Sequence, residues 1–263
     1  MTLTDFKGFK IVTSDLFSKY NIKHFFSTIS DESTGNKSVT FGFREDNREE
    51  VLKNYEKVAD YFNVPVTSIT KSTQVHKDVV MEVEECHIGM GVTKKTMTDN
   101  ADGLITDVEK IPLCIFTADC VPVLIADKKG TVVSAVHSGW RGTVMEITVN
   151  SINTMTEKYG IKKEDIICAI GPCISKCCFE VSKEVIDEVL KIKGAESTFY
   201  AKENEKYMLD LKELNKLILL NAGIPEENID VSDMCTKCED ELFFSYRRQG
   251  EKAGRNASFI MKG

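Results

Sequence analysis

The sequence lacks the long apolar segments and basic clusters that are typical of membrane-spanning and nucleic-acid-binding proteins. No window approaches the roughly 20 apolar residues of a membrane span, and the start, MTLTDFKGFK, has no apolar core of a secretory signal. The net charge is −7, which disfavours a general role on nucleic acid or anionic membrane, because phosphate binding needs clustered lysine and arginine. We therefore expect a cytoplasmic protein with no nucleic-acid or membrane partner; the oligomeric state is left open.

The sequence also lacks internal repeats, low-complexity tracts and any linker rich in proline, glycine or serine. Its 263 residues are enough to bury a sizeable core, and we predict a single domain over residues 1–263. Nine cysteines are present without a secretory signal, so a disulfide framework is disfavoured. Reduced core thiols or metal ligands are the better interpretations.

Short apolar, β-branched runs dominate the first two-thirds of the chain and predict strands. They occupy residues 9–13, 22–29, 78–84, 101–107, 112–119, 121–127, 131–137 and 165–171. Helical periodicity follows over residues 48–62 and 144–159, while Ser182 and Asp210 are candidate caps of two later helices. The tail from residue 243 is predicted as a strand, a basic loop and a closing strand. This mixture predicts a layered α/β fold with mixed sheets.

The chain has only four histidines, so each can be weighed. His24 lies in an aromatic run and is predicted to pack in a strand, and His87 is predicted in a loop. His76 and His137 close strand-like segments, and Cys120 follows a break in an apolar run. Strand ends are where α/β folds build sites, and two imidazoles with one thiolate suit zinc, leaving a fourth position for water. The spacing has no local signature, so a buried thiol with two hydrogen-bonded histidines is the alternative.

A second group of cysteines competes for a metal. Its members are Cys173, Cys177 and Cys178 in GPCISKCCFEV, and Cys235 and Cys238 in CTKC. Together they suit a structural zinc site with four thiolates or an iron–sulfur site. Cysteine is, however, among the most buried residue types, and the first pair is a CxxxC. Buried thiols are therefore the favoured interpretation of this group.

Four arginines lie in glycine-bearing loops of this acidic chain: Arg141, Arg247, Arg248 and Arg255. Guanidinium groups receive phosphate bidentately, and a solvated basic loop is the alternative for each of them. Arg141 and Arg255 are taken as the phosphate-binding candidates.

Several motifs occur in a fixed order: TQVH (73–76), ADGLITD (101–107), FTADCVPVLIAD (116–127), VHSGWRGT (136–143), AIGPCISKCCFEV (169–181), LDL (209–211), FFSYRR (243–248) and GR (254–255). Together they resemble the YfiH/laccase-domain family over nearly the whole chain. The resemblance implies a layered α/β/α/β sandwich with mixed sheets, similar to the catalytic domain of cytotoxic necrotizing factor. Members were first described as polyphenol oxidases, and some bacterial members are linked to peptidoglycan editing.

The activity implied by the resemblance is a zinc-dependent purine nucleoside phosphorylase that also deaminates adenosine. Its substrates would be phosphate and the purine nucleosides adenosine, inosine, guanosine and methylthioadenosine. The family's zinc ligands correspond to His76, Cys120 and His137, the trio that donor chemistry also favours. Asp119 is then a proton carrier or a residue that orients the site.

The N-terminal region departs from the family pattern. Where the family reads FSTR-x-GG, this sequence reads FSTISDES, so Ile29 replaces an arginine and residues 30–32 replace a glycine turn. That arginine is a phosphate contact candidate, and its loss would weaken phosphorolysis. Arg44 is the nearby residue that could substitute for it.

Three rival functions remain. A copper-dependent polyphenol oxidase needs roughly ten clustered ligands, and a chain with four histidines and no HxH is poorly equipped for it, so copper is less suited than zinc. A cysteine hydrolase would use Cys120 as nucleophile and His137 as base. A non-catalytic zinc protein is the third possibility. Metal content and phosphate dependence separate these functions.

Overall fold

The computed structural model describes residues 1–44, 46–95 and 100–263, and its backbone forms three sheets. The first, sheet A, has the strand order β1-β2-β3-β15-β7-β4. Its strands are β1 (Thr2–Phe6), β2 (Phe9–Thr13), β3 (Lys23–Asp31), β4 (Thr70–Lys71), β7 (Leu113–Thr117) and β15 (Asn256–Met261). Only the short β4 pairs parallel to its neighbour; the other pairings in sheet A are antiparallel.

The second large sheet, sheet B, has the order β14-β10-β8-β9-β6-β5. Its strands are β5 (Val80–Glu82), β6 (Gly103–Thr106), β8 (Val121–Asp127), β9 (Val133–Ser138), β10 (Ile166–Ile170) and β14 (Ile229–Val231). A small third sheet of order β11-β13-β12 contains β11 (Glu180–Ser182), β12 (Phe199–Ala201) and β13 (Lys206–Leu209). The predicted mixed sheets are therefore confirmed.

The described helices are α1 (Asp15–Lys19), α2 (Arg48–Phe62), α3 (Trp140–Val144), α4 (Ile147–Glu157), α5 (Lys183–Val189), α6 (Leu211–Asn221) and α7 (Tyr246–Gln249). Short 3-10 turns occupy Val66–Ser68, Glu85–His87, Lys163–Asp165, Ala195–Thr198, Glu226–Asn228 and Gly250–Lys252. Within the described ranges, no helix has the length and apolar character needed to cross a membrane.

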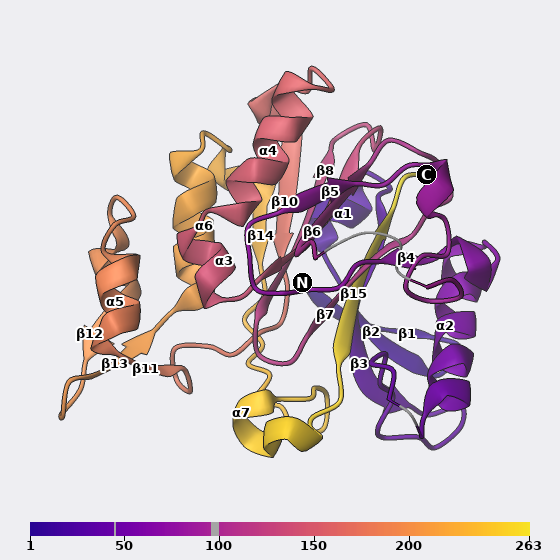
Figure 1. Ribbon diagram of the computed structural model, residues 1–263, viewed down its shortest axis with the longest axis horizontal. Coiled ribbons are helices and arrows are strands. Elements are labelled where there is room, and N and C mark those ends of the chain that lie inside the picture. Colours follow the sequence, from indigo (N-terminus) through magenta and orange to yellow (C-terminus); the bar gives the residue numbers. More distant parts are fainter. Residues whose placement is uncertain (45, 96–99) are drawn as a thin grey trace.

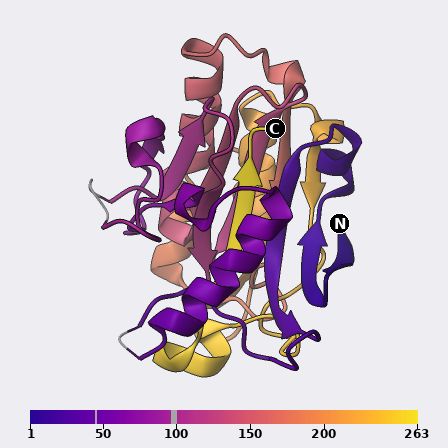
Figure 2. The same ribbon diagram turned by 90° about the vertical axis from the view of Figure 1, so that its right-hand side faces the viewer.

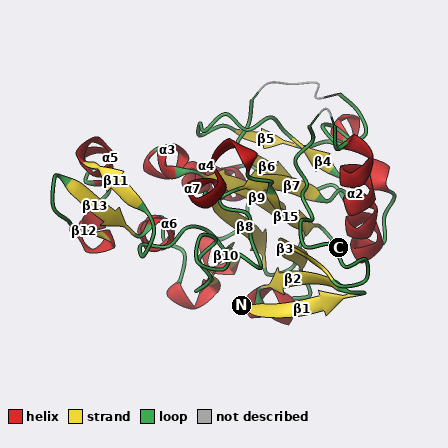
Figure 3. Cartoon of the chain, turned by 90° about the horizontal axis from the view of Figure 1, so that it is seen from below, coloured by secondary structure: helices red, strands yellow, loops and turns green. Residues whose placement is uncertain are grey.

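The two large sheets pack directly against each other, with helices on their outer faces. Phe26 and Leu113 of sheet A share an apolar cluster with Leu124 and Ala135 of sheet B. Helix α2 covers the outer face of sheet A, and α4 and α6 cover the outer face of sheet B, so α2 lies on the opposite side of the molecule from them (Figures 1 and 3). Figure 2 shows α2 running across the strands of sheet A.

The predicted layered α/β fold is confirmed, and its layers follow the order helix, sheet A, sheet B, helix. The central strands β8 and β15 are buried along their whole length, because each face of their sheets is covered by another layer. A continuous apolar run shows that both faces are covered. It does not distinguish a covering sheet from a covering helix, and here the two sheets cover each other.

Most predicted elements are confirmed, and two are wrong in detail. All eight predicted strands are present, and α2 spans the predicted residues 48–62. The helix predicted from Val144 begins earlier, at Trp140, and breaks at Glu146, which adopts a left-handed φ of 55°. The predicted strand at residues 243–245 is absent, and α7 lies in place of the basic loop, because the Ser245 hydroxyl accepts the Arg248 N–H and caps the helix.

Candidate metal centre and its pocket

Strand pairing brings two of the predicted ligands together. His137 lies near the end of β9 and pairs with Pro122 of β8, so that Cys120, just before β8, reaches the same edge of sheet B. His76 comes from the loop after β4, not from a strand end as predicted. The ligand atoms of His76, Cys120 and His137 all lie within 4.8 Å of one another. Zn–N and Zn–S bonds of about 2.0 and 2.3 Å require this spacing.

The buried carboxylate of Asp102 organises this cluster. It accepts the backbone N–H groups of Val75, His76 and Lys77 at 2.9–3.0 Å, and it lies 2.7 Å from Nδ1 of His137. His76 has a left-handed φ of 61°, and these three hydrogen bonds hold its strained turn. With Nδ1 of His137 bonded to a carboxylate, Nε2 is the ring nitrogen that could bind a metal.

A glycine leaves the space between the ligands. A Cβ at Gly139 would lie 2.9 Å from Nδ1 of His76, 3.3 Å from Sγ of Cys120 and 3.6 Å from Cε1 of His137. The φ of Gly139 is −64°, which any residue adopts, so the requirement for glycine here is the space and not the backbone. Gly139 therefore keeps the centre of the cluster open.

The electrostatics of the cluster favour positive charge on one side and neutral imidazole on the other. Burial opposes charge on His137, yet the Cys120 sulfur and Asp102 raise its pKa to about 9. Burial, the neighbouring His137 and Arg141 lower the pKa of His76. Asp102 is desolvated, but its hydrogen bonds from His137 and the backbone keep its pKa below the usual value. The surroundings of His137 thus favour a positive charge on its ring, whereas those of His76 favour the neutral imidazole.

The cluster lies in the wall of a pocket of about 570 Å³. Its apolar lining includes the aromatic rings of Phe116, Trp140, Phe179 and Tyr246. Its cationic lining consists of Lys71, Arg247 and Arg255. This combination of flat apolar surface and positive charge suits a ligand that has both a ring system and an anionic group.

The predicted arginines fall in different places. Arg255 lines the pocket, and its Nη1 donates to the carbonyls of Ala253 and Gly254. Arg141 is exposed and does not line the pocket. Cζ of its guanidinium group lies 4.3 Å from the Trp140 ring centroid. Arg247, which was not among the two favoured arginines, does line the pocket.

Asp119 also lines the pocket, but both of its carboxylate oxygens are engaged. Oδ1 accepts the Thr236 hydroxyl at 2.7 Å, and Oδ2 accepts the Arg247 N–H at 2.6 Å. Its φ of 89° is left-handed, and Cys120 follows directly. These bonds fix the turn that carries Cys120.

Asp102 is the site residue that sequence analysis did not single out. The signal was present, because Asp102 belongs to the ADGLITD motif. Its role depends on contacts with the backbone of residues 75–77 and with His137 at the end of β9. The spacing of residues along the chain does not predict these contacts.

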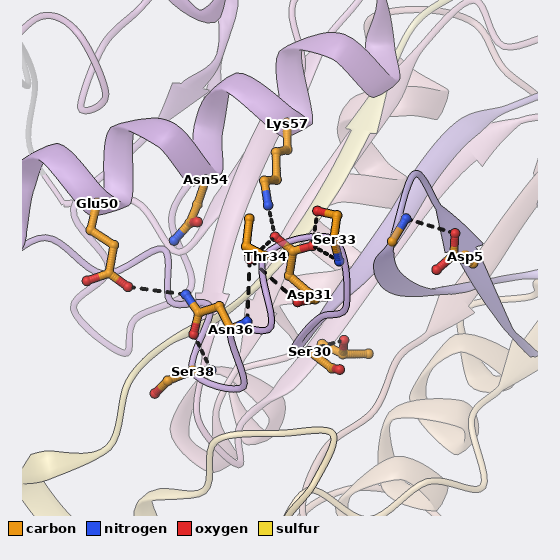
Figure 4. Close-up of polar contacts among 12 residues, drawn as sticks. Asp5, Ser30, Asp31, Ser33, Thr34, Asn36, Ser38, Glu50, Asn54 and Lys57 are labelled. Carbon is orange, nitrogen blue, oxygen red and sulfur yellow. Dashed lines mark hydrogen bonds and ion pairs between the residues drawn. The ribbon is translucent and has the colours of Figure 1, made fainter.

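The N-terminal departure from the family pattern builds a turn of its own, shown in Figure 4. The Asp31 carboxylate accepts hydrogen bonds from the Ser33 N–H, the Ser33 hydroxyl and the Thr34 hydroxyl. It also forms an ion pair with Lys57. Ile29 is buried, and its N–H donates to the Leu242 carbonyl. A carboxylate thus organises the turn where the family pattern has glycines.

Arg44, the predicted substitute, is exposed and lies outside the pocket lining. Its Nη2 donates to the carbonyls of Glu251 and Ala253. It therefore anchors the segment that leads to Arg255.

Comparison with known proteins decides the family. A family model described as "Multi-copper polyphenol oxidoreductase laccase" matches residues 20–263. The chain belongs to this laccase-domain family. The resemblance predicted from the motifs is confirmed.

Individual laccase-domain relatives cover most of the chain. This chain is 38% identical to the purine nucleoside phosphorylase YlmD of Bacillus subtilis, and the match covers 80% of this chain and 77% of the relative. It is 30% identical to the adenosine deaminase RL5 of an unknown prokaryotic organism, over 78% and 79% of the two chains. The crystal structure of the hypothetical protein YfiH from Bacillus licheniformis superposes with a TM-score of 0.88 at 31% identity, covering 98% of both chains.

Proposed function

We propose that this protein is a zinc-dependent purine nucleoside phosphorylase that also deaminates adenosine. The observation that carries the proposal is the convergence of His76, Cys120 and His137 on one wall of the aromatic and cationic pocket. The names of the relatives supply the substrate class, which is a purine nucleoside with phosphate.

The donor set fits zinc. Two imidazoles and one thiolate provide three ligands with borderline-soft character and leave a fourth position open. The space kept by Gly139 and the bond from Asp102 to His137 agree with a ligand set prepared for an ion. A zinc ion bound there would supply a Lewis acid to activate water or to polarise an oxygen of phosphate or nucleoside.

The remaining pocket residues would bind and orient the two substrates. Phe116, Phe179 and Tyr246 offer rings against which a purine can pack. Arg247 and Arg255 bring positive charge for phosphate, which would be placed against the ribose carbon that bears the base.

Two further assignments belong to the proposal. Asp119 acts as a positioning residue for Cys120, or carries a proton once a substrate displaces one of its bonds. Arg141 contacts an anion only if it leaves the Trp140 ring.

A cysteine hydrolase is the second candidate, favoured by one observation. His137 hydrogen-bonds to the Cys120 sulfur, which contributes to raising the His137 pKa, so an imidazole lies beside a thiol as in a cysteine nucleophile with its base. This mechanism needs no contribution from His76. The two functions therefore differ in their response to the loss of His76.

The test combines metal content with product analysis. We expect one zinc per chain to be lost in both His76→Ala and Cys120→Ala, together with phosphate-dependent release of hypoxanthine from inosine. Cys86→Ser, which changes an exposed cysteine outside the pocket lining, should retain zinc and activity.

Opposite results would overturn the proposal in identifiable ways. Full zinc and full activity in Cys120→Ala would remove the ligand assignment. Activity that persists in His76→Ala without zinc would favour the cysteine hydrolase. Turnover of inosine that does not depend on phosphate would replace phosphorolysis with hydrolysis.

A further inference from the structure

Four cysteine sulfurs form a second cluster outside the pocket lining. Cys177 and Cys178 lie in the loop between β10 and β11, and Cys235 and Cys238 lie between β14 and α7. Their sulfur atoms all lie within 4.8 Å of one another. The elements that follow the two loops, β11 and α7, lie at the lower edge of the molecule in Figure 1.

The distances match a tetrahedron. Sγ of Cys177 lies 3.6 Å from Cys178, 3.7 Å from Cys235 and 3.7 Å from Cys238, and Cys178 lies 3.4 Å from Cys238. Four sulfurs at about 2.3 Å from a central zinc are separated by about 3.8 Å. A disulfide would require about 2.05 Å, and an iron–sulfur cluster would hold its cysteines further apart because several iron and sulfide atoms stand between them.

Burial does not explain this cluster, contrary to the favoured sequence interpretation. Cys177 and Cys238 are exposed and Cys178 is half-buried, whereas only Cys235 is buried. Cys173, the fifth cysteine of the predicted group, is fully buried, and its sulfur lies outside the group of four and donates to the Ile174 carbonyl. The buried-thiol interpretation therefore holds for Cys173 and fails for the exposed pair.

The backbone around Cys235 is arranged to stabilise a thiolate. The Ser175 N–H donates to Sγ of Cys235 at 3.4 Å. Backbone N–H groups of Lys237 and Cys238 also donate to this sulfur. Metal ligands of this kind must be deprotonated, and the CTKC segment supplies both sulfur and N–H donors.

From this geometry we propose that Cys177, Cys178, Cys235 and Cys238 bind a structural zinc ion as four thiolates. Binding displaces the protons of the cysteines that are still thiols, and no redox step is involved. The ion is independent of the His76, Cys120 and His137 site and brings the metal content to two per chain.

The metal would join two loops that shape the pocket. Thr236, between the ligands Cys235 and Cys238, donates to Asp119 beside Cys120. Arg247, which lines the pocket, donates from Nη1 to the Cys178 carbonyl. The second site therefore braces one wall of the pocket without contacting its ligand.

Metal analysis of the whole protein tests the proposal. Wild-type protein that is loaded with zinc and dialysed should hold two equivalents per chain. Cys177→Ser/Cys238→Ser and His76→Ala should each hold one, and the matched control Cys86→Ser should hold two. If His76→Ala retains no metal while wild type holds one, the four-cysteine site does not exist.

A second measurement works on wild-type protein and is independent of mutant folding. With zinc bound, Cys177, Cys178 and Cys238 should resist alkylation under native conditions, while exposed Cys86 reacts as an internal standard. A strong chelator should then expose them. Alkylation of these three cysteines at the rate of Cys86 with zinc present would overturn the proposal. Protection that a thiol reductant relieves and a chelator does not would indicate disulfides, and a bound metal identified as iron would exclude zinc.

Discussion

At the scale of single residues, the candidate metal centre depends as much on residues that bind nothing as on its ligands. Gly139 keeps open the space between His76, Cys120 and His137, and Asp102 holds two of these ligands from behind. Neither residue supplies a metal-binding atom. The geometry of the site is therefore distributed beyond the trio of ligands.

Gly139→Ala tests this dependence. The new Cβ would lie 2.9 Å from Nδ1 of His76, so the ligand must move, and we expect zinc affinity to fall by roughly tenfold or more. Competition with a chromophoric chelator measures the change. Gly142→Ala is the matched control, because its Cβ would meet nothing closer than 3.3 Å and touches no ligand side chain. Equal affinity in both variants would contradict the steric role of Gly139.

The candidate ligands were singled out from sequence for two different reasons. With four histidines in the chain, each of them could be weighed, whereas Cys120, one of nine cysteines, was marked by a break in an apolar run and by the motif that contains it. Asp102 is one of many acidic residues, and its position beside His137 follows from tertiary structure. A rare residue type marks a candidate ligand in the sequence, whereas the role of a supporting carboxylate can be recognised only from the fold.

At the scale of elements, one end of β9 is fixed to two helices by a buried polar network. The Asn215 side chain of α6 donates to the Thr143 hydroxyl of α3 and to the Leu211 carbonyl, and its Oδ1 accepts the Ser138 hydroxyl of β9. All these groups are buried. The network holds α3 in place where the chain leaves His137.

Asn215→Ala should lower the free energy of unfolding by about 2–3 kcal/mol, since it removes three buried hydrogen bonds. Chemical denaturation measures this loss. The neighbouring Lys216→Ala is the control, because it removes an ion pair to exposed Glu226 and should cost no more than about 1 kcal/mol. Comparable losses in the two variants would show that the network adds no special stability.

Local patterns predict the elements, and the resemblance to the family predicts their layered arrangement. The segments that form β8 and β9 are largely apolar, and the apolar residues of α2 recur with helical periodicity. Strands and helix can therefore both be predicted from the sequence. The packing of sheet A on sheet B has no sequence pattern of its own, because a strand that is buried on both faces has the same apolar sequence whether a sheet or a helix covers it. The helix α7 depends on the Ser245 cap, which the basic residues after it obscured.

At the scale of the whole molecule, a buried histidine connects parts of both sheets. Nε2 of His24 accepts the Ser14 N–H, and Nδ1 donates to the Ile22 carbonyl, so the ring is neutral. The hydroxyl of Ser14 in turn donates to Asp230 on β14. Burial lowers the pKa of His24 to about 4.

This lowered pKa predicts a loss of stability on acidification. The unfolded chain takes up the His24 proton near pH 6.5, but the folded chain does so only near pH 4. The free energy of unfolding should therefore fall between pH 6.5 and pH 4, by up to about 3 kcal/mol from this group. Denaturation across this range should show a smaller slope in His24→Gln than in wild type. Equal slopes in the two proteins would contradict the assignment.

The β8–β9 pairing has a consequence for the order of assembly. Cys120 and His137 meet through an antiparallel hairpin of neighbouring strands, which closes over a short stretch of chain. His76 is held by Asp102, which meets His137 where β6 pairs with β9. From these contacts we expect the two local donors to meet first and His76 to join them once the centre of sheet B is paired. A metal ion that needs all three donors would then bind only the completed sheet.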